Sequence, residues 1–519
     1  MKIWLRETNW PWHPERYRFP TEQMLLTLFP REKPMYSDAP PNIPAGEDGV
    51  VVTLSRGKKL ATVKVLVALE GRSQLGTARF PSEKLDEPEK QVYHTVSHAL
   101  KQAFYKAGTA LLGRELPWGS LTGVRPVKLP TRAMRLGKTA KQARRELEQE
   151  YRVSPPRAAL AVECAQAALD VQKGLQRDGL ALYLGVPFCP TRCAYCSFIS
   201  SDVKGSLALV EPYVDALCRE IKLAGTLLRE KGLHITSAYM GGGTPTTRSA
   251  EQLDRVLACV ERSLPMEHCV EFTVEAGRPD TLTADKLKTL KAHEVHRISI
   301  NPQTMEDNVL RAIGRDHTAS QIEEAYELAG RHFGGLVNMD LIAGLPTDTP
   351  DGFQRTLDRV LAMGPANITV HTLALKKGSR LTEEGGTLPS SEDVEIMLAL
   401  VSDRLREAGY APYYLYRQKY MSGSFENVGW ARPGAVCAYN IVMMEELQTV
   451  LSLGAGGITK LVDPDHGQII RLNNPKYAKE YLESWDKIAT DKKTAAAFQA
   501  ALAPRGDALR GVTFPPWEK

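Results

Sequence analysis

The chain has 519 residues, 43% hydrophobic and 24% charged, which allows several domains with sizeable cores and excludes a disordered or fibrous protein. The net charge of +5 comes without a long Lys/Arg run, so we expect no nucleic-acid partner, whereas an anionic small molecule is compatible. With no stretch of about 20 apolar residues and no apolar leader at the N-terminus, we expect a soluble cytoplasmic protein without membrane contact.

The N-terminal part has the pattern of a small α+β domain. Residues 49–55 and 58–69 are strand-like and predict a hairpin closed on a Gly-Lys turn. Residues 87–113 repeat apolar positions at helical spacing, and the helix should end at Gly113. We therefore predict an accessory α+β domain over residues 1–175, to which no chemistry can be assigned.

From residue 181 the chain alternates short apolar runs with amphipathic helices, which predicts an α/β fold with parallel strands and right-handed crossovers. We expect a barrel, closed or partly closed, over residues 176–385. A mainly helical, substrate-covering domain should follow over residues 386–519. The active site of such a barrel lies at the carboxyl ends of its strands, where polar and glycine-rich residues cluster in this sequence. The six strand-like runs are residues 181–186, 235–240, 270–276, 297–300, 337–344 and 367–375.

Three cysteines, Cys189, Cys193 and Cys196, follow the first run with C-x-x-x-C-x-x-C spacing. A structural zinc site needs four ligands, and nearby Cys164 and Cys218 fall on predicted helices away from this loop. Thiolates also suit iron–sulfur clusters, and three thiolates on a four-iron four-sulfur (4Fe–4S) cluster would leave one iron open for a ligand. We favour the cluster, although a distant fourth ligand would still allow zinc.

The cysteine spacing, followed by GGGTPT at residues 241–246, resembles the radical S-adenosylmethionine (SAM) superfamily. Further motifs resemble the coproporphyrinogen dehydrogenase family, the oxygen-independent coproporphyrinogen III oxidases of haem synthesis. Residues 118–129 and 413–434 are most similar to its HemZ-type branch. The family motifs follow one another at residues 183–198, 240–246, 273–282, 297–318 and 337–353.

This resemblance implies a radical SAM partial (β/α)6 barrel with a 4Fe–4S cluster on the three cysteines. It makes Tyr183 and Glu275 the catalytic candidates. Asp340 could instead orient a backbone turn, Arg315 could be a surface residue, and Glu275 could pair with Arg278. The residues implied to bind SAM are Tyr183, Gly242, Gly243, Thr244, Glu275, Gln303, Arg315, Asp340 and Ala374.

The implied reaction is oxidative decarboxylation of two propionates of coproporphyrinogen III to vinyl groups, giving protoporphyrinogen IX. SAM would be consumed as a co-substrate, and flavodoxin or ferredoxin would supply electrons. Substrate carboxylates need cationic partners, for which Arg417, Lys419 and Arg432 are candidates, although a solvated face is an equal alternative for each.

Some positions depart from the family pattern. The oxidases have a histidine at the position of Gly185 and a fourth cysteine at the position of Phe198, and relatives have Gly-Val where this chain has Asn301-Pro302. Phe198 makes the loop similar to that of the HemW-type haem chaperones. The alternatives to the oxidase are therefore a haem-binding chaperone and another radical SAM reaction on a tetrapyrrole, such as methyl transfer linked to ring opening.

Overall fold

The chain divides into two compact units in a computed structural model. One unit is Met1–Glu163 with Arg417–Phe425, and the other is Cys164–Tyr416 with Glu426–Lys519. We predicted boundaries near residues 175 and 385; in the structure the first lies earlier, and most of the C-terminal segment belongs to the unit that contains the barrel. The structure describes residues 1–30, 32–37, 43, 47–196, 201–202, 204–375, 379–384, 387–418 and 425–503.

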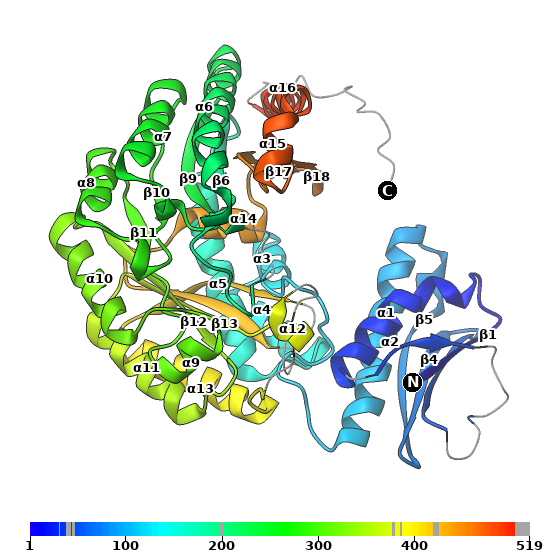
Figure 1. Cartoon of the computed structure of the whole chain (residues 1–519). Helices are drawn as coiled ribbons and strands as arrows, with labels where there is room; N and C mark the ends of the chain where they lie inside the picture. Colours follow the sequence, from blue (N-terminus) through cyan, green and yellow to red (C-terminus); the bar gives the residue numbers. More distant parts are fainter. Residues whose placement is uncertain are drawn as a thin grey trace. The chain divides into compact units, whose positions relative to one another are not determined.

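The first unit is a five-stranded sheet with helices packed on it (Figure 1). The predicted hairpin is confirmed, because β3 and β4 pair antiparallel with Arg56 opposite Ala61. The predicted helix, α2, ends as expected at Gly113, whose φ of 68° suits glycine. The elements are β1 (Lys2–Thr8), α1 (Arg18–Leu28), β2 (Met35–Tyr36), β3 (Gly49–Arg56), β4 (Leu60–Leu69), β5 (Arg72–Pro81), α2 (Glu89–Leu112), α3 (Lys128–Arg135), α4 (Ala140–Glu150) and the start of α5 (Pro155–Lys173).

The centre of the second unit is the predicted partial barrel. Six parallel strands pair in chain order, and each coincides with one of the six apolar runs. These strands are β6 (Gly179–Val186), β9 (His234–Gly242), β10 (Phe272–Glu275), β11 (Arg297–Ser299), β12 (Leu336–Ala343) and β13 (Asn367–Thr372).

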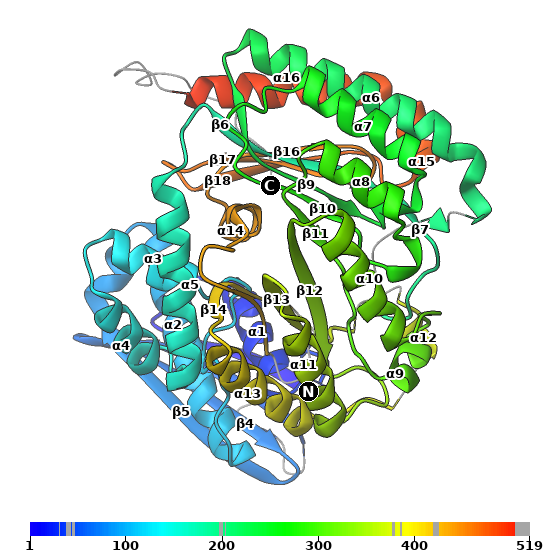
Figure 2. The same cartoon turned by 90° about the vertical axis from the view of Figure 1, so that its left-hand side faces the viewer.

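Helices follow the strands and cover the outer face of this sheet (Figures 1 and 2). The main core lies between them, because alternate residues such as Leu182 and Leu184 pack against helical residues such as Leu217. The helices are α6 (Leu207–Glu230), α7 (Ala250–Ser263), α8 (Ala284–Ala292), α9 (Asp307–Ala312), α10 (Ala319–His332) and α11 (Pro350–Met363).

The C-terminal segment combines its predicted helices with strands that the sequence did not predict. Among the described residues, β14 and β15 continue the sheet beyond β13, while β16, β17 and β18 continue it beyond β6. Of these, β16 runs parallel to β6. The elements are α12 (Arg380–Glu384), α13 (Ser391–Glu407), β14 (Ala411–Arg417), β15 (Glu426–Ala431), α14 (Ala438–Glu445), β16 (Val450–Leu453), β17 (Ile458–Asp463), β18 (Gln468–Asn473), α15 (Ala478–Glu483) and α16 (Trp485–Leu502).

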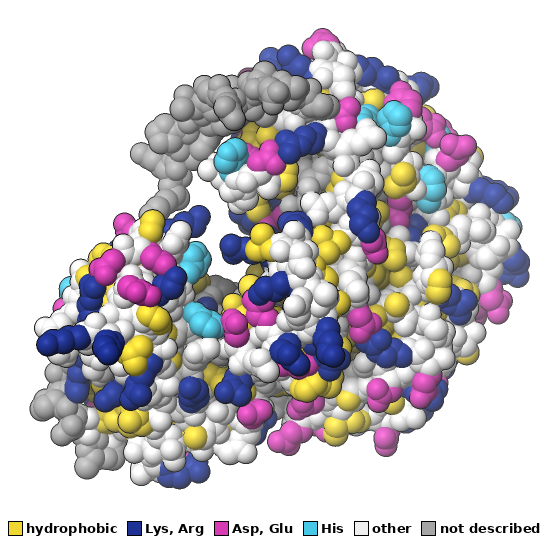
Figure 3. Space-filling view, turned by 180° about the vertical axis from the view of Figure 1, so that it is seen from behind, with side chains coloured by type: hydrophobic (Ala, Val, Ile, Leu, Met, Phe, Trp, Pro, Cys, Tyr) yellow, Lys and Arg dark blue, Asp and Glu magenta, His cyan; other side chains and the backbone are white. Residues whose placement is uncertain are grey.

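Basic and acidic side chains are interspersed on the face that Figure 3 shows. Across the described part of the chain, no helix combines the length and the apolar character that crossing a bilayer requires.

Candidate functional site

The three cysteines of the C-x-x-x-C-x-x-C loop lie beyond the carboxyl end of β6. Cys189 ends the short strand β7 (Phe188–Cys189), and its Sγ lies 3.6 Å from Thr244 Oγ1. The amide N–H of Cys196 donates to the carbonyl of Cys193 at 3.1 Å, which closes a turn between them. None of the three is in a disulfide, so each can serve as a thiolate ligand.

The glycine-rich segment at the end of β9 lies directly against this loop. The N–H of Gly243 donates to the carbonyl of Val186 at 2.6 Å, and that of Thr244 donates to the carbonyl of Phe188 at 2.7 Å. A Cβ at Gly243 would lie 2.2 Å from the Phe188 oxygen, and Gly242 has a φ of 105°. Only glycine permits this close approach and this backbone conformation.

Two buried arginines hold the cysteine loop. Arg278 donates to Thr191 Oγ1 at 2.7 Å and pairs with Asp280 at 3.0 Å. The alternative that Arg278 pairs with Glu275 is therefore wrong. The loop is fixed from the segment that follows β10.

Arg315 holds the same loop from the segment after α9. Its guanidinium donates to Tyr195 Oη at 3.3 Å and to the carbonyl of Asn301 at 2.6 Å. The side chain is buried, so the alternative of a surface residue is wrong. Burial opposes its charge, but the neighbouring Tyr195 and Cys193 more than offset this and raise the pKa of Arg315.

A buried carboxylate lies inside the barrel at the same edge. Glu275 ends β10, accepts a hydrogen bond from the Tyr239 hydroxyl, and accepts another from Asn301 Nδ2 at 3.0 Å. Burial, and then the negative charge of Asp340 on β12, raise the pKa of Glu275 to about 7. Its charge can therefore change near neutral pH.

Sequence reasoning missed His371, which extends this polar group along β13. Its Nε2 lies 3.6 Å from Asp340 Oδ2, and its Nδ1 lies 3.3 Å from Tyr416 Oη. The available signal was strand parity, because His371 lies two residues after Thr369, which contacts Tyr414 on the same face.

Tyr239 and Tyr439, which the sequence analysis missed, form a row with the predicted Tyr183. Tyr183 and Tyr239 are paired across β6 and β9, and their rings stack with centroids 6.5 Å apart. Tyr439 of α14 stacks on Tyr239 at 4.8 Å. Only the tertiary structure places Tyr439 there, because its helix is more than 190 residues further along the chain than Tyr239.

Two other predicted residues, Gln303 and Ala374, lie at the same edge. Gln303 has a φ of 68°; its N–H donates to the carbonyl of Asp340 at 2.9 Å, and its own carbonyl accepts from Ile342 at 3.0 Å. Ala374 is partly buried just beyond β13. The structure thus gathers the predicted site residues at the carboxyl ends of the six barrel strands.

Of the candidate substrate cations, Arg432 does not join this group. Arg432 lies at the amino end of β13, where its N–H donates to the carbonyl of Ala366 and its guanidinium donates to Tyr410 Oη. Arg417 belongs to the first unit and donates to the carbonyl of Leu121 at 2.5 Å. Lys419 and Phe198 lie outside the described residues.

The residues present fit a cluster and a polar cofactor. Within the described ranges, no three His, Cys, Asp or Glu side chains are gathered for a single metal ion. Three cysteines outside any disulfide nevertheless share one loop, and thiolates are the usual ligands of 4Fe–4S clusters. Two buried atoms beside them, Asn301 Oδ1 and Arg315 Nε, have no hydrogen-bond partner among the described residues and are available to a polar ligand.

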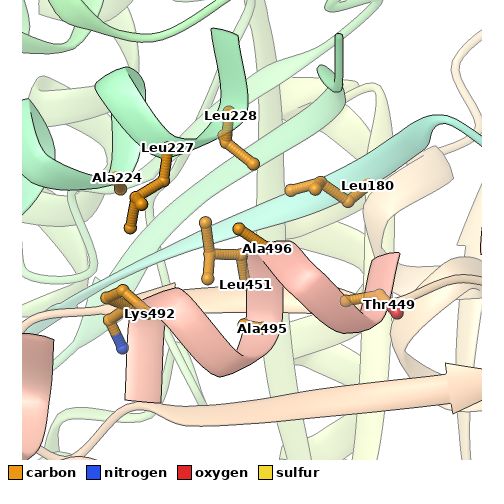
Figure 4. A pocket seen from close by; sticks show the side chains of 9 residues that line it. All are labelled: Leu180, Ala224, Leu227, Leu228, Thr449, Leu451, Lys492, Ala495 and Ala496. Atoms are coloured by element: carbon orange, nitrogen blue, oxygen red, sulfur yellow. The ribbon is translucent and has the colours of Figure 1, made fainter. Parts of the chain in front are cut away.

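A small cavity elsewhere in the second unit has a different character. It is mainly apolar and includes none of the predicted site residues (Figure 4). It therefore does not compete with the carboxyl edge of the barrel as a functional site. Its walls are Leu180, Ala224, Leu227, Leu228, Thr449, Leu451, Lys492, Ala495 and Ala496.

The chain is similar to several known proteins. Residues 183–360 match the radical SAM superfamily. The oxygen-independent coproporphyrinogen-III oxidase-like protein HemZ of Bacillus subtilis (strain 168) is 38% identical over 412 residues, which are 78% of this chain and 82% of that protein. The heme chaperone HemW of Escherichia coli (strain K12) is 27% identical over 60% of this chain and 80% of its own. The solved structure of coproporphyrinogen III oxidase HemN from Escherichia coli, titled a radical SAM enzyme, has a TM-score of 0.49 at 24% identity and covers 62% of this chain and 73% of its own.

Replacing a loop cysteine tests the cluster assignment. We expect Cys193→Ala to lose bound iron and all SAM cleavage while keeping its fold, because Cys193 lies in a loop outside the strands. Iron and sulfide analysis, circular dichroism and 5′-deoxyadenosine assays measure these effects. Cys269→Ala, which removes a free thiol outside the loop, should keep its iron. An active Cys193→Ala protein with full iron content would contradict the assignment.

Adding one methyl group tests the glycine-rich segment. Gly243→Ala forces a Cβ against the Phe188 carbonyl, so we expect a loss of about 1–3 kcal/mol in the free energy of unfolding and weaker SAM binding. Denaturant unfolding and equilibrium dialysis measure the two effects. The matched control is Gly330→Ala on α10, where a Cβ meets no atom within 4 Å. Wild-type SAM affinity in Gly243→Ala would remove this segment from the cofactor site.

Proposed function

Because the chain belongs to the HemZ-like group of oxygen-independent coproporphyrinogen-III oxidase-like proteins, within the radical SAM superfamily, we propose that it converts coproporphyrinogen III to protoporphyrinogen IX. Two propionates would be oxidatively decarboxylated to vinyl groups. The cofactors of this superfamily are a 4Fe–4S cluster and SAM. The observation that carries the proposal is the loop with three cysteines outside any disulfide, whose Cys189 thiol lies against Thr244 at the barrel edge that also holds Glu275.

The cofactor site follows from the chemistry of these side chains. Cys189, Cys193 and Cys196 would hold the cluster, and the exposed backbone of Gly242 and Gly243 would line the SAM site. When bound, these cofactors would supply the abstraction of a hydrogen atom from the β-carbon of each propionate. The propionate would then lose carbon dioxide and pass one electron to a one-electron acceptor outside the chain, which leaves the vinyl group.

Other residues would bind SAM and shield the reaction from water. Ionised Glu275 can accept from an ammonium group, and Asp340 or Gln303 can accept from ribose hydroxyls. The guanidinium of Arg315 can bind a carboxylate through its unpaired Nε. Tyr183 would lie beside SAM, where the tyrosine row limits access of water. Ala374 would contact the adenine ring.

In this proposal, a separate donor protein supplies the electron that reduces the cluster. Flavodoxin or ferredoxin is the class of donor that we propose, since the cluster must be reduced by one electron in each turnover. The tetrapyrrole substrate would occupy the barrel mouth. Its carboxylates need cationic partners other than Arg432, which lies at the opposite end of β13.

Haem binding is the second candidate function, because Gly185 counts against the oxidase. A Cβ at this position would lie 2.6 Å from the carbonyl oxygen of Ala455, so the backbone leaves no room for the histidine of the oxidases. The similarity to heme chaperone HemW supports the same candidate. A chaperone would bind haem and cleave SAM without decarboxylating coproporphyrinogen.

The pH dependence of SAM binding tests the role of Glu275. Below pH 7 this carboxyl group is largely protonated, so SAM affinity should rise with pH and level off above its pKa of about 7, with a limiting slope of about tenfold per pH unit. Calorimetry between about pH 6 and about pH 8.5 measures this. Glu275→Gln should bind weakly and without this dependence, whereas the surface variant Glu267→Gln should behave as wild type. The same pH profile in Glu275→Gln would exclude this role.

Product analysis tests the reaction itself. The reconstituted, reduced protein is mixed with SAM and coproporphyrinogen III without oxygen, and tetrapyrroles and nucleosides are identified by mass spectrometry. We expect protoporphyrinogen IX with about one SAM consumed per vinyl group. Cys193→Ala is the blank. SAM cleavage without carbon dioxide loss, together with tight haem binding, would assign the chaperone, and S-adenosylhomocysteine would assign methyl transfer.

A further inference from the structure

Tyr213, on the helix that follows the cysteine loop, joins two backbone segments at the mouth of the barrel. Its hydroxyl donates to the carbonyl of Gly185 at 2.6 Å and accepts from the N–H of Ala455 at 2.9 Å. The side chain is fully buried. One phenol group therefore links the end of β6 to the turn that follows β16.

The ring of Tyr213 contacts three further parts of the unit. Phe188, which precedes the first cysteine, meets it edge-on with centroids 5.4 Å apart. Tyr481 of α15 lies 5.2 Å away, and the guanidinium carbon of Arg248 lies 5.9 Å from the ring centroid. The guanidinium of Arg248 is buried and has no hydrogen-bond partner among the described residues, so the face of the Tyr213 ring is one of the groups that can stabilise its charge.

The two segments that Tyr213 joins are in direct backbone contact. A Cβ on Gly185 would meet the Ala455 oxygen at 2.6 Å, and a Cβ on Gly454 would meet the Gly185 oxygen at 2.4 Å. Gly454 also has a φ of 86°. Only glycine at both positions allows this contact. The backbone of the C-terminal turn therefore fills the space that a side chain at residue 185 would need.

Glu220, two turns after Tyr213 on α6, fixes the same turn from behind. Its carboxylate accepts from the N–H of Gly454 at 2.7 Å and from Tyr481 Oη at 2.6 Å. It also pairs with Lys492 of α16 at 3.1 Å, and both side chains are at most 1% exposed. Lys492 borders the small cavity, and its nitrogen points away from Leu227 in Figure 4. The two buried charges neutralise each other, and the hydrogen bonds of Glu220 restrict movement of the turn.

We propose that Tyr213 is a positioning residue for the cofactor site. By holding Gly185 against Ala455, it fixes the last residues of β6. The carbonyls of Val186 and Phe188 in turn hold Gly243 and Thr244. The C-terminal segment thus acts on the site through its backbone. This inference rests on the proposed placement of the cluster and SAM, and it does not require a particular tetrapyrrole reaction.

The test is Tyr213→Phe in the full chain, which removes only the bridging oxygen. Without cofactors, we expect faster amide hydrogen exchange in residues 453–457. With the cluster rebuilt, iron content should be unchanged, while the change that SAM causes in the electron paramagnetic resonance spectrum of the cluster should weaken. KM for SAM in 5′-deoxyadenosine formation should rise about ten- to a hundredfold with kcat within about twofold.

The matched control is Tyr410→Phe at the opposite end of the barrel. That buried hydroxyl likewise donates to a carbonyl, that of Pro365 at 2.6 Å, and accepts from a nitrogen, Arg432 Nε at 3.1 Å. Its KM for SAM should remain that of the wild type. Wild-type KM and spectrum in Tyr213→Phe, or an equal KM change in Tyr410→Phe, would overturn the proposal.

If Tyr213→Phe does not fold, a second variant tests whether the contact between these two segments positions the cofactor site. Gly185→Ala drives the same two backbones apart from the other side, so it should also raise KM for SAM with iron retained, and a wild-type KM would overturn the proposal. The hydrogen-exchange measurement needs no cofactor, and the other readouts use only SAM and the cluster. A wild-type protein that cleaves SAM but makes no protoporphyrinogen would therefore refute the proposed reaction while leaving the role of Tyr213 testable.

Discussion

The candidate site depends on close backbone contact around the end of β6. Gly243 lies against Phe188 on one side of this strand, and Gly454 lies against Gly185 on the other. A Cβ at either glycine would have to displace a carbonyl group, so the strand end can be held between β9 and β16 only with glycine at these positions. The first cysteine, Cys189, lies three residues beyond the end of this strand. The position of the cysteine loop therefore depends on how the strand end is held.

Buried charged residues at the two ends of the barrel have different neighbours. At the amino end, Arg297 is 1% exposed, pairs with Glu271 at 3.2 Å and donates to Asn338 at 2.8 Å and to the carbonyl of Ala435 at 3.0 Å. Its charge is compensated, as structural buried groups require. At the carboxyl end, Glu275 lies near the like charge of Asp340, and its pKa is raised. A buried carboxyl group with a shifted pKa is typical of a functional site.

The fold and the specific reaction rest on different observations. Superfamily membership follows from identity with a HemZ relative over most of the chain, and a shared barrel does not distinguish oxidase from chaperone. At the barrel mouth, Gly185 leaves no space for a side chain. The C-terminal segment contributes to the mouth as well, through Ala455 and through Tyr439.

The sequence by itself determined the six barrel strands, the helices between them and the position of the cysteine loop. Periodicity and spacing are local properties, and a parallel sheet with right-handed crossovers leaves few ways to connect such elements. Only the tertiary structure decided which distant residues meet this edge. The short strand β16 has four residues and no distinctive period, so its pairing with β6 was not predictable. The same holds for Tyr213 and Tyr439, because the contacts of a side chain depend on long-range packing that local sequence does not encode.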